Sequence, residues 1–320
     1  MVRTFAFLRK CSYLCRRIGH LIYMSAKTKY YRVAEHTFSL NASEQWFGLL
    51  SNYTPFEIAE GVSEPIFTLT AENNGMLSPE GVAQLTPLFV DSSDEDMPRI
   101  EVYRQDDQWL FRIAMVANAP VCCELWCSSD FRQARLCFAS SERNVRFCLD
   151  NAMMLLFAFR TAALRTLEMH AAVVVKDGRG FLFLGKSGTG KSTHARQWLQ
   201  AFDDAWLLND DNPILRVMDD GEVRVFGSPW SGKTPCYKNE SAPVEAIVKL
   251  SQAPKNTLRR LRLPEAYAYI LSSASGLKTE RNMADAIYET IRAIVLSTPC
   301  YHLDCLPNTD AARTCYGERE

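Results

Sequence analysis

The sequence has almost no net charge, no internal repeats and no uncharged apolar run long enough to cross a bilayer. Its 320 residues carry 36 Lys and Arg against 37 Asp and Glu, a formal net charge of −1. Such a chain has no general electrostatic attraction for nucleic acid, and we expect no nucleic-acid partner. The most apolar stretch, 149–164, is shorter than the roughly 20 residues of a transmembrane helix and contains Arg160. We therefore expect a buried helix there and no integral membrane segment.

A regular cysteine framework is also missing. The 11 cysteines are odd in number and irregularly spaced, which is typical of reduced thiols and predicts a cytoplasmic protein. Cys122, Cys123 and Cys127 raise the alternative of a metal site. Adjacent strand residues point to opposite faces, however, and no second cysteine pair with zinc spacing follows. Packing within a strand is the favoured interpretation.

The first 23 residues lack the unbroken apolar region of a secretory signal, because Lys10, Arg16 and Arg17 interrupt it. A basic amphipathic membrane helix is one alternative. We favour another: residues 1–23 are a loose tail or a mis-assigned start, and translation begins at Met24.

The rest of the chain divides by its pattern into two parts. Residues 24–147 contain short β-rich runs separated by turn-forming residues, which predicts a β-rich N-terminal lobe. Residues 148–320 begin with the apolar helix and continue with two hydrophobic runs, 171–175 and 181–184. The short polar linker between these runs predicts a β-hairpin.

The most informative motif is GKSGTGKST, which lies between an apolar run and a helical pattern, as phosphate-binding loops do. Its glycines let successive backbone N–H groups surround an anion, and the helix N-terminus adds positive potential. We expect Lys191 to reach the β- and γ-phosphates of ATP and the Ser192 hydroxyl to bind Mg²⁺. The predicted nucleotide-binding residues are Gly185, Lys186, Ser187, Gly188, Thr189, Gly190, Lys191, Ser192 and Thr193.

Two adjacent carboxylates, Asp210 and Asp211, end the next apolar run, 19 and 20 residues after Lys191. GTPases and transport ATPases place the corresponding carboxylate farther along, so this spacing argues against both classes. One aspartate can hold Mg²⁺ while the other accepts a proton from an attacking hydroxyl. The alternative is a solvated turn, but the position after an apolar run favours a functional pair.

These residues resemble the C-terminal catalytic domain of the bacterial HPr kinase/phosphorylase family. The resemblance covers about residues 165–320 and is carried by His170 before the hairpin, by the loop and by the aspartate pair. That family shares its nucleotide-binding core with ATP-dependent phosphoenolpyruvate carboxykinase. The resemblance implies an α/β fold, in which a P-loop core with a mixed sheet follows the β-rich lobe.

The resemblance also implies an enzyme, a P-loop kinase that uses ATP and Mg²⁺ to phosphorylate a serine hydroxyl in a protein or peptide. Asp210 would bind the metal and Asp211 would act as the base, although the opposite assignment stays open. His170 would lie near the phosphates, or it is a packed core residue. The family implies self-association into a homo-oligomer. The alternatives are a metabolite kinase, a reversible kinase/phosphorylase and an ATP sensor without turnover.

The chain departs from that family in two places. The segment that contacts the substrate HPr is not found, and GSPWSGKTPCY, 227–237, stands in its place. Trp230 and Lys233 in this segment are candidate substrate-loop residues, and a plain connection is the alternative. The chain has only five histidines and no evident Mn²⁺ or oxaloacetate ligands, which argues against carboxykinase activity.

Overall fold

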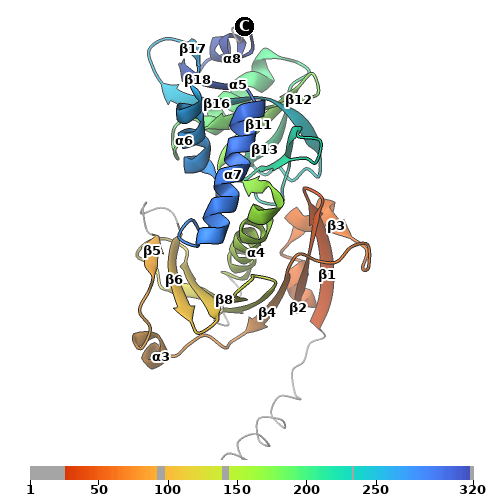
Figure 1. Ribbon diagram of the computed structural model, residues 1–320. Coiled ribbons are helices and arrows are strands. Elements are labelled where there is room, and N and C mark those ends of the chain that lie inside the picture. The colour runs from red at the N-terminus through yellow and green to blue at the C-terminus, as the bar shows by residue number, and fades with distance from the viewer. Residues whose placement is uncertain (1–25, 92–97, 139–143, 233, 318–320) are drawn as a thin grey trace, which may run out of the picture.

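The computed structural model describes residues 26–91, 98–138, 144–232 and 234–317. The predicted tail, 1–23, and Lys233 lie outside these residues. The described residues form a mixed α/β structure with two nine-stranded sheets (Figure 1).

The first sheet forms the N-terminal lobe and curves around one helix (Figure 1). Its strand order is β3-β1-β2-β4-β9-β8-β7-β6-β5. Only the pairs β2–β4 and β4–β9 are parallel. The strands are β1 (Ala26–Val33), β2 (His36–Ser43), β3 (Glu57–Ile58), β4 (Thr68–Asn73), β5 (Phe89–Asp91), β6 (Arg99–Gln105), β7 (Gln108–Ala114), β8 (Val121–Ser128) and β9 (Gln133–Phe138).

Most of these strands lie where the β-rich runs predicted them, but the run YRVAEHTFSL, residues 31–40, which predicted one strand, belongs to a hairpin of two strands. Ala34 and Glu35 form its turn with φ of 47° and 66°. Two positive φ values at the centre of a two-residue turn match the right-handed twist of the flanking strands. Short helical segments complete the lobe: α2 (Glu44–Phe47), η1 (Ser51–Phe56) and α3 (Pro79–Ala83).

Helix α4 (Val145–Thr161) lies in the hollow of the curved sheet and continues into η3 (Ala162–Leu164) (Figure 1). It packs on β8 and β9 of the first sheet and on β10 of the second. By length and composition alone, Val145–Leu164 could cross a membrane, but 56% of its most apolar window is buried inside the protein. This burial is typical of a core helix.

The second sheet carries the predicted phosphate loop, residues 185–193. Its main strand order is β10-β14-β15-β16-β12-β11-β13, and β18 pairs with both β16 and β17. The strands are β10 (Thr166–Glu168), β11 (Ala171–Lys176), β12 (Arg179–Leu184), β13 (Trp206–Asp211), β14 (Ile214–Val217), β15 (Val223–Phe226), β16 (Ser241–Gln252), β17 (Thr257–Arg260) and β18 (Cys300–Cys305). The predicted hairpin is confirmed, because β11 pairs antiparallel with β12.

Helices cover both faces of this sheet, which explains why the central strands β11 and β12 are almost continuously apolar. Helices α5 (Lys191–Ala201) and α8 (Thr309–Gly317) cover one face, where Val174 and Phe183 join their core. Helices α6 (Leu263–Ser273) and α7 (Arg281–Ser297) cover the other. The alternate β11 residues Val173 and Val175 join that second core, which continues without a break into the N-terminal lobe.

Candidate functional site

The phosphate loop connects the end of β12 to the start of α5. Gly190 is the N-cap of α5 with φ of 106°, and Gly188 has φ of 77°. Residues with a side chain rarely adopt these backbone conformations. The backbone N–H of His194 donates to the carbonyl oxygen of Gly190, which starts the helix. The free N–H groups of the first turn therefore face the loop, as an anion site requires.

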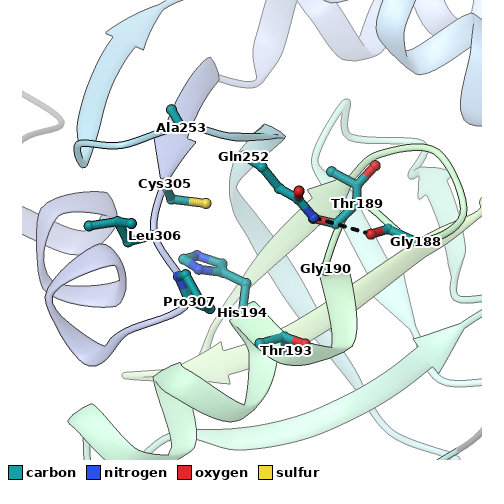
Figure 2. Close-up of a pocket in the computed structure, with 10 residues that line it drawn as sticks. All are labelled: Gly188, Thr189, Gly190, Thr193, His194, Gln252, Ala253, Cys305, Leu306 and Pro307. Atoms are coloured by element: carbon teal, nitrogen blue, oxygen red, sulfur yellow. Dashed lines mark hydrogen bonds between the residues drawn. The ribbon is translucent and has the colours of Figure 1, made fainter.

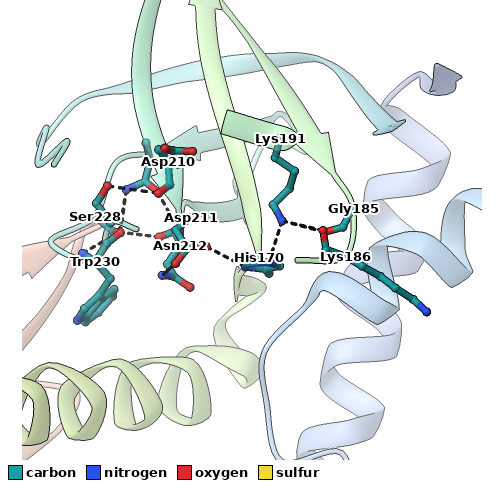
Figure 3. A network of polar contacts seen from close by, with 11 residues as sticks. His170, Gly185, Lys186, Lys191, Asp210, Asp211, Asn212, Ser228 and Trp230 are labelled. Atoms are coloured by element: carbon teal, nitrogen blue, oxygen red, sulfur yellow. Dashed lines mark hydrogen bonds and ion pairs between the residues drawn. The ribbon is translucent and has the colours of Figure 1, made fainter. Parts of the chain in front are cut away.

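Lys191 is buried at the centre of this loop. Its Nζ donates to the carbonyl oxygen of Gly185 at 2.9 Å and lies 2.8 Å from His170 Nε2 (Figure 3). Burial lowers the pKa of Lys191, and the nearby charges of Asp211 and Asp210 partly oppose that shift. The ammonium group is therefore held by the protein where a bound anion would also stabilise it.

His170 connects the lysine to the aspartate pair. Its Nδ1 lies 3.0 Å from Asp211 Oδ1, on the opposite side of the ring from Lys191 (Figure 3). An ammonium group has no lone pair, so Nε2 accepts its hydrogen bond, and a neutral imidazole then carries its proton on Nδ1. His170 thus donates to Asp211, which orients this carboxylate.

The two aspartates have different surroundings. Asp210 is only 4% exposed, whereas the side chain of Asp211 is 35% exposed. Asn212 Nδ2 donates to Asp211 Oδ2 at 3.2 Å, so both oxygens of Asp211 have a partner. Asp211 also has φ of 148°, a conformation that is strained for a residue with a side chain and that is concentrated at functional sites.

The segment 227–232 holds the aspartates in place. The backbone N–H of Gly232 donates to the carbonyl oxygen of Asp210 at 2.7 Å. A Cβ at Gly232 would lie 3.0 Å from that oxygen and 3.1 Å from Asp211 Cβ, so only glycine approaches this closely. Asn209 donates to Ser228 Oγ and to the carbonyl oxygen of Trp230, which ties the segment to the end of β13.

Trp230, predicted as a substrate-loop residue, is almost fully buried. Its ring lies 5.3 Å from that of Phe157 in α4, and its Nε1 donates to Tyr53 in η1 at 2.8 Å. The main role of this ring is therefore to fix the loop to the N-terminal lobe. Lys233, the other predicted residue, is outside the described residues.

Most of the predicted residues come together around one cavity of about 450 Å³, named the phosphate cavity after the predicted loop. Gly185, Lys186 and Thr189 do not line it, and the Lys186 side chain points away from His170 (Figure 3). Three unpredicted residues do line it: Arg196, Gly232 and Thr234. The i,i+4 helical spacing from Ser192 could have suggested Arg196, whereas Gly232 and Thr234 depend on how segment 227–234 folds back. The predicted residues in the lining are His170, Ser187, Gly188, Gly190, Lys191, Ser192, Thr193, Asp210 and Asp211.

A second cavity of about 560 Å³ lies along the loop and shares Gly188, Gly190 and Thr193 with the first (Figure 2). The ends of β16 and β18 form its other wall. Gln252 Nε2 donates to the carbonyl oxygens of Gly188 and Thr189, both at 3.4 Å. Its remaining lining is partly apolar: His194, Ala253, Cys305, Leu306 and Pro307.

Glu168 adds a buried carboxyl group near the aspartates. Burial, with a contribution from the charge of Asp211, raises its pKa to about 8. At neutral pH the protonated form therefore predominates, which avoids a third negative charge beside Asp210 and Asp211.

A family model described as SynChlorMet cassette protein ScmC matches residues 136–308, a little over half of the chain. The chain belongs to the ScmC family. The expected membership of the HPr kinase/phosphorylase-like family is therefore wrong. The matched residues of this chain include the phosphate loop, His170 and the aspartate pair. The motif that suggested the HPr kinase family therefore lies inside the region that matches the ScmC model. A comparison with curated proteins gives no match.

Proposed function

We propose that this ScmC protein is an ATP-dependent phosphotransferase that phosphorylates a serine hydroxyl in a protein or peptide. The supporting observation is that the phosphate loop, Lys191, His170 and the aspartate pair line a single cavity. Phosphoryl transfer depends mostly on positioning and charge stabilisation, which these groups can provide.

The cavity residues fit a triphosphate and a magnesium ion. Lys191 and the first turn of α5 supply positive charge and N–H donors on one side. The Ser192 hydroxyl makes no side-chain hydrogen bond to another described residue, and the buried carboxylate of Asp210 lines the same cavity. Hydroxyl and carboxylate oxygens are ligands that Mg²⁺ prefers. When bound, the ion would supply charge neutralisation for the phosphates.

Asp211 is the better placed base. Its carboxylate is exposed to the cavity, and His170 and Asn212 orient its two oxygens. In the transfer, the acceptor oxygen bonds to the γ-phosphorus as the bridging P–O bond to ADP breaks, and Asp211 takes the hydroxyl proton. The hydrogen bond from His170 holds the Asp211 carboxylate in position for that step.

The second cavity supports the choice of a nucleotide as phosphoryl donor. It begins at the loop residues Gly188 and Thr189 and has the partly apolar lining that a nucleoside base requires. A triphosphate on the loop would thus have its base in this cavity and its γ-phosphate in the one containing Asp211.

The test uses the purified chain with γ-labelled ATP, Mg²⁺ and either cell lysate or free serine. We expect Lys191→Ala to abolish ATP binding, because it removes the cation at the phosphates. Asp211→Asn should retain ATP binding and lose transfer by about 10²- to 10⁴-fold. Asp219→Asn, in the exposed turn between β14 and β15, is the matched control and should resemble the wild type.

Wild-type activity in the Asp211→Asn variant would show that the base is assigned wrongly. Labelled free serine would indicate a metabolite kinase, and ATP binding without any labelled acceptor would indicate a sensor. Either result would contradict the proposed function.

A further inference from the structure

A small polar cavity lies beside Asp211, between the two lobes of the chain. It has a volume of about 190 Å³ and is lined by residues of η1, of α4 and of the segment 229–237. Asn212 connects it to the phosphate cavity, because this residue lines the polar cavity and also donates to Asp211 Oδ2. The polar cavity is therefore one side chain away from the proposed base.

One acceptor atom in this cavity has no partner among the described residues, whereas the nearby Asp150 carboxylate has donors in Asn52, Tyr53 and Arg146. Asn52 is only 2% exposed; its Nδ2 donates to Asp150 Oδ1 and to the carbonyl oxygen of Pro229. Its Oδ1 is buried and accepts no hydrogen bond from any described residue. The other Asp150 oxygen has Arg146 Nε at 3.5 Å, and the Arg146 side chain is 47% exposed.

Burying an acceptor without a donor costs about 1 to 3 kcal/mol, so such a group in a cavity calls for an N–H group from a ligand. Burial also raises the pKa of Asp150, which means that an added donor or cation would stabilise its ionised form. The cavity has room for one side chain, next to the place where an acceptor hydroxyl would meet Asp211.

We propose that this cavity receives a residue with an N–H-bearing side chain, Lys, Arg, Gln or Asn, close in sequence to the acceptor serine of a peptide. Its N–H groups donate to Asn52 Oδ1 and to the Asp150 carboxylate. The N-terminal lobe thereby takes part in substrate selection, since Asn52 belongs to η1. This inference rests on the proposed phosphotransferase function.

The test measures kcat/KM on alanine-based peptides with one central serine, in which Lys, Gln, Leu or Glu is placed at each flanking position. At one position we expect Lys and Gln to exceed Leu by about 10- to 100-fold, the effect of a hydrogen bond to a charged group. Asp150→Asn should reduce the preference for Lys over Gln at that position and leave ATP binding unchanged. Asp107→Asn, in the exposed turn between β6 and β7, is the matched control.

The two hypotheses fail in different ways. Phosphorylation that does not depend on the flanking residue, or an Asp150→Asn variant with unchanged preference, overturns the cavity assignment while transfer remains. No label in any peptide or lysate protein overturns the proposed function, and the cavity assignment with it.

A second inference comes from three buried thiols in the N-terminal lobe and is independent of the phosphate cavity. Cys122 and Cys123 in β8 and Cys148 in α4 have sulfur atoms within 4.8 Å of one another. The expectation that adjacent cysteines point to opposite faces is wrong here, because a β-bulge interrupts the pairing of β7 and β8. Ile113 pairs with Cys123 and Ala114 with Val121, so Cys122 is the extra residue, and such a bulge redirects a side chain.

The sulfur positions suit a soft metal ion. Cys122 Sγ and Cys148 Sγ are 3.8 Å apart, and two thiolates bound to one tetrahedral zinc at about 2.3 Å would lie ~3.8 Å apart. All three side chains are buried. Cys127, named with the first two in the sequence, does not belong to this group.

The geometry points to Cys122, Cys123 and Cys148 as a three-thiolate site for one thiophilic cation, Zn²⁺ or Cu⁺. Three S–H bonds lose their protons to solvent and three metal–sulfur bonds form, with no change of oxidation state. Thiolate ligands select these two ions among the common metals. The ion would link β8 to α4 and so stabilise the lobe.

The test is metal analysis of the purified, reduced chain before and after addition of Zn²⁺ or Cu⁺, with Co²⁺ as a spectroscopic probe. We expect about one ion per chain, sulfur-to-cobalt charge-transfer absorption and a higher Tm with metal. Cys148→Ser and Cys122→Ala should lose all three signals, whereas Cys127→Ala, a buried control in the same strand, should keep them. A folded wild type that binds neither ion, or variants that bind as well as wild type, would overturn the assignment.

Discussion

At the residue scale, the site depends on a hydrogen-bonded chain from Lys191 through His170 to Asp211. Its two contacts measure 2.8 Å and 3.0 Å and join residues from α5, from the start of the hairpin and from β13. His170 is the only member that touches both others, so it sets the distance between the Lys191 ammonium group and the proposed base. A misplacement of about 1 Å at such a position can cost about 10²-fold in rate.

We therefore expect His170→Ala to lower kcat by about 10- to 100-fold, with a smaller change in the KM for ATP. Asp211 loses its donor and Lys191 loses an acceptor, but the backbone cradle of the phosphate loop stays. Steady-state kinetics over a range of ATP concentrations separates the two effects. His302→Ala, in β18 and outside the phosphate cavity, serves as control. A purely structural role for His170 would instead lower Tm and leave the kcat of the folded fraction unchanged.

At the element scale, the segment 227–232, which follows β15, positions the aspartates through hydrogen bonds. Ser228, the backbone of Trp230 and the N–H of Gly232 all bond to residues of β13 or to Asn212. The Trp230 ring anchors the same segment against α4 and η1. The strained backbone of Asp211 is thus held by contacts on both sides, as persistent strain requires.

Gly232→Ala is expected to reduce transfer more than stability. The added Cβ would meet the Asp210 carbonyl oxygen at 3.0 Å and Asp211 Cβ at 3.1 Å, so the aspartates or the segment must move. Overpacking of this kind costs about 1 to 3 kcal/mol of unfolding free energy, and displaced carboxylates cost activity in addition.

The measurement pairs denaturant unfolding with the transfer rate of the folded protein. Gly317→Ala in α8 is the matched control, because a Cβ there meets no atom within 4 Å. Full activity in a stable Gly232→Ala protein would show that the close approach of this segment does not position the aspartates.

At the scale of the whole molecule, the two lobes are joined by a shared core and by polar contacts. His36 Nε2, at the start of β2, lies 2.9 Å from Thr166 Oγ1 in β10 of the other sheet. Arg216 donates to the carbonyl oxygen of Ala34 and to Glu35 in the adjacent turn. Burial, with a contribution from the charge of Arg216, lowers the pKa of His36 from 6.5 to about 4.

The lowered pKa of His36 predicts that the contact between the two lobes loses stability in acid. The folded state favours neutral His36, so its contribution to stability is present above pH 6.5 and is lost as the pH falls through 4. A shift of this size corresponds to about 3 kcal/mol of unfolding free energy. Urea unfolding of the wild type and of His36→Gln, from pH 7.5 to pH 4, measures it.

The glutamine in His36→Gln cannot be protonated. The difference in unfolding free energy between the wild type and this variant should therefore fall by about 3 kcal/mol from pH 7.5 to pH 4. Carboxyl groups that titrate in the same window affect both proteins and cancel in the difference. Parallel profiles would mean that His36 stays neutral or is solvated when protonated.

The sequence by itself determined the local parts of the site. The apolar run, the glycines and the helical pattern specified strand, loop and helix around Lys191, and the polar linker specified the hairpin, because these depend on neighbouring residues alone. The motif did not determine the family. Its few residues are compatible with more than one family, whereas the ScmC model extends over residues 136–308.

Only the tertiary structure decided what surrounds those parts. The contact of Gly232 with Asp210, the cavity shared by Asn52 and Asp150, and the approach of Cys148 to Cys122 join residues that are 22 to 98 positions apart in the chain. Such contacts leave no periodic signal, since they depend on how whole elements pack. The bulge at Cys122 also reversed a side chain against the alternation that a regular strand predicts.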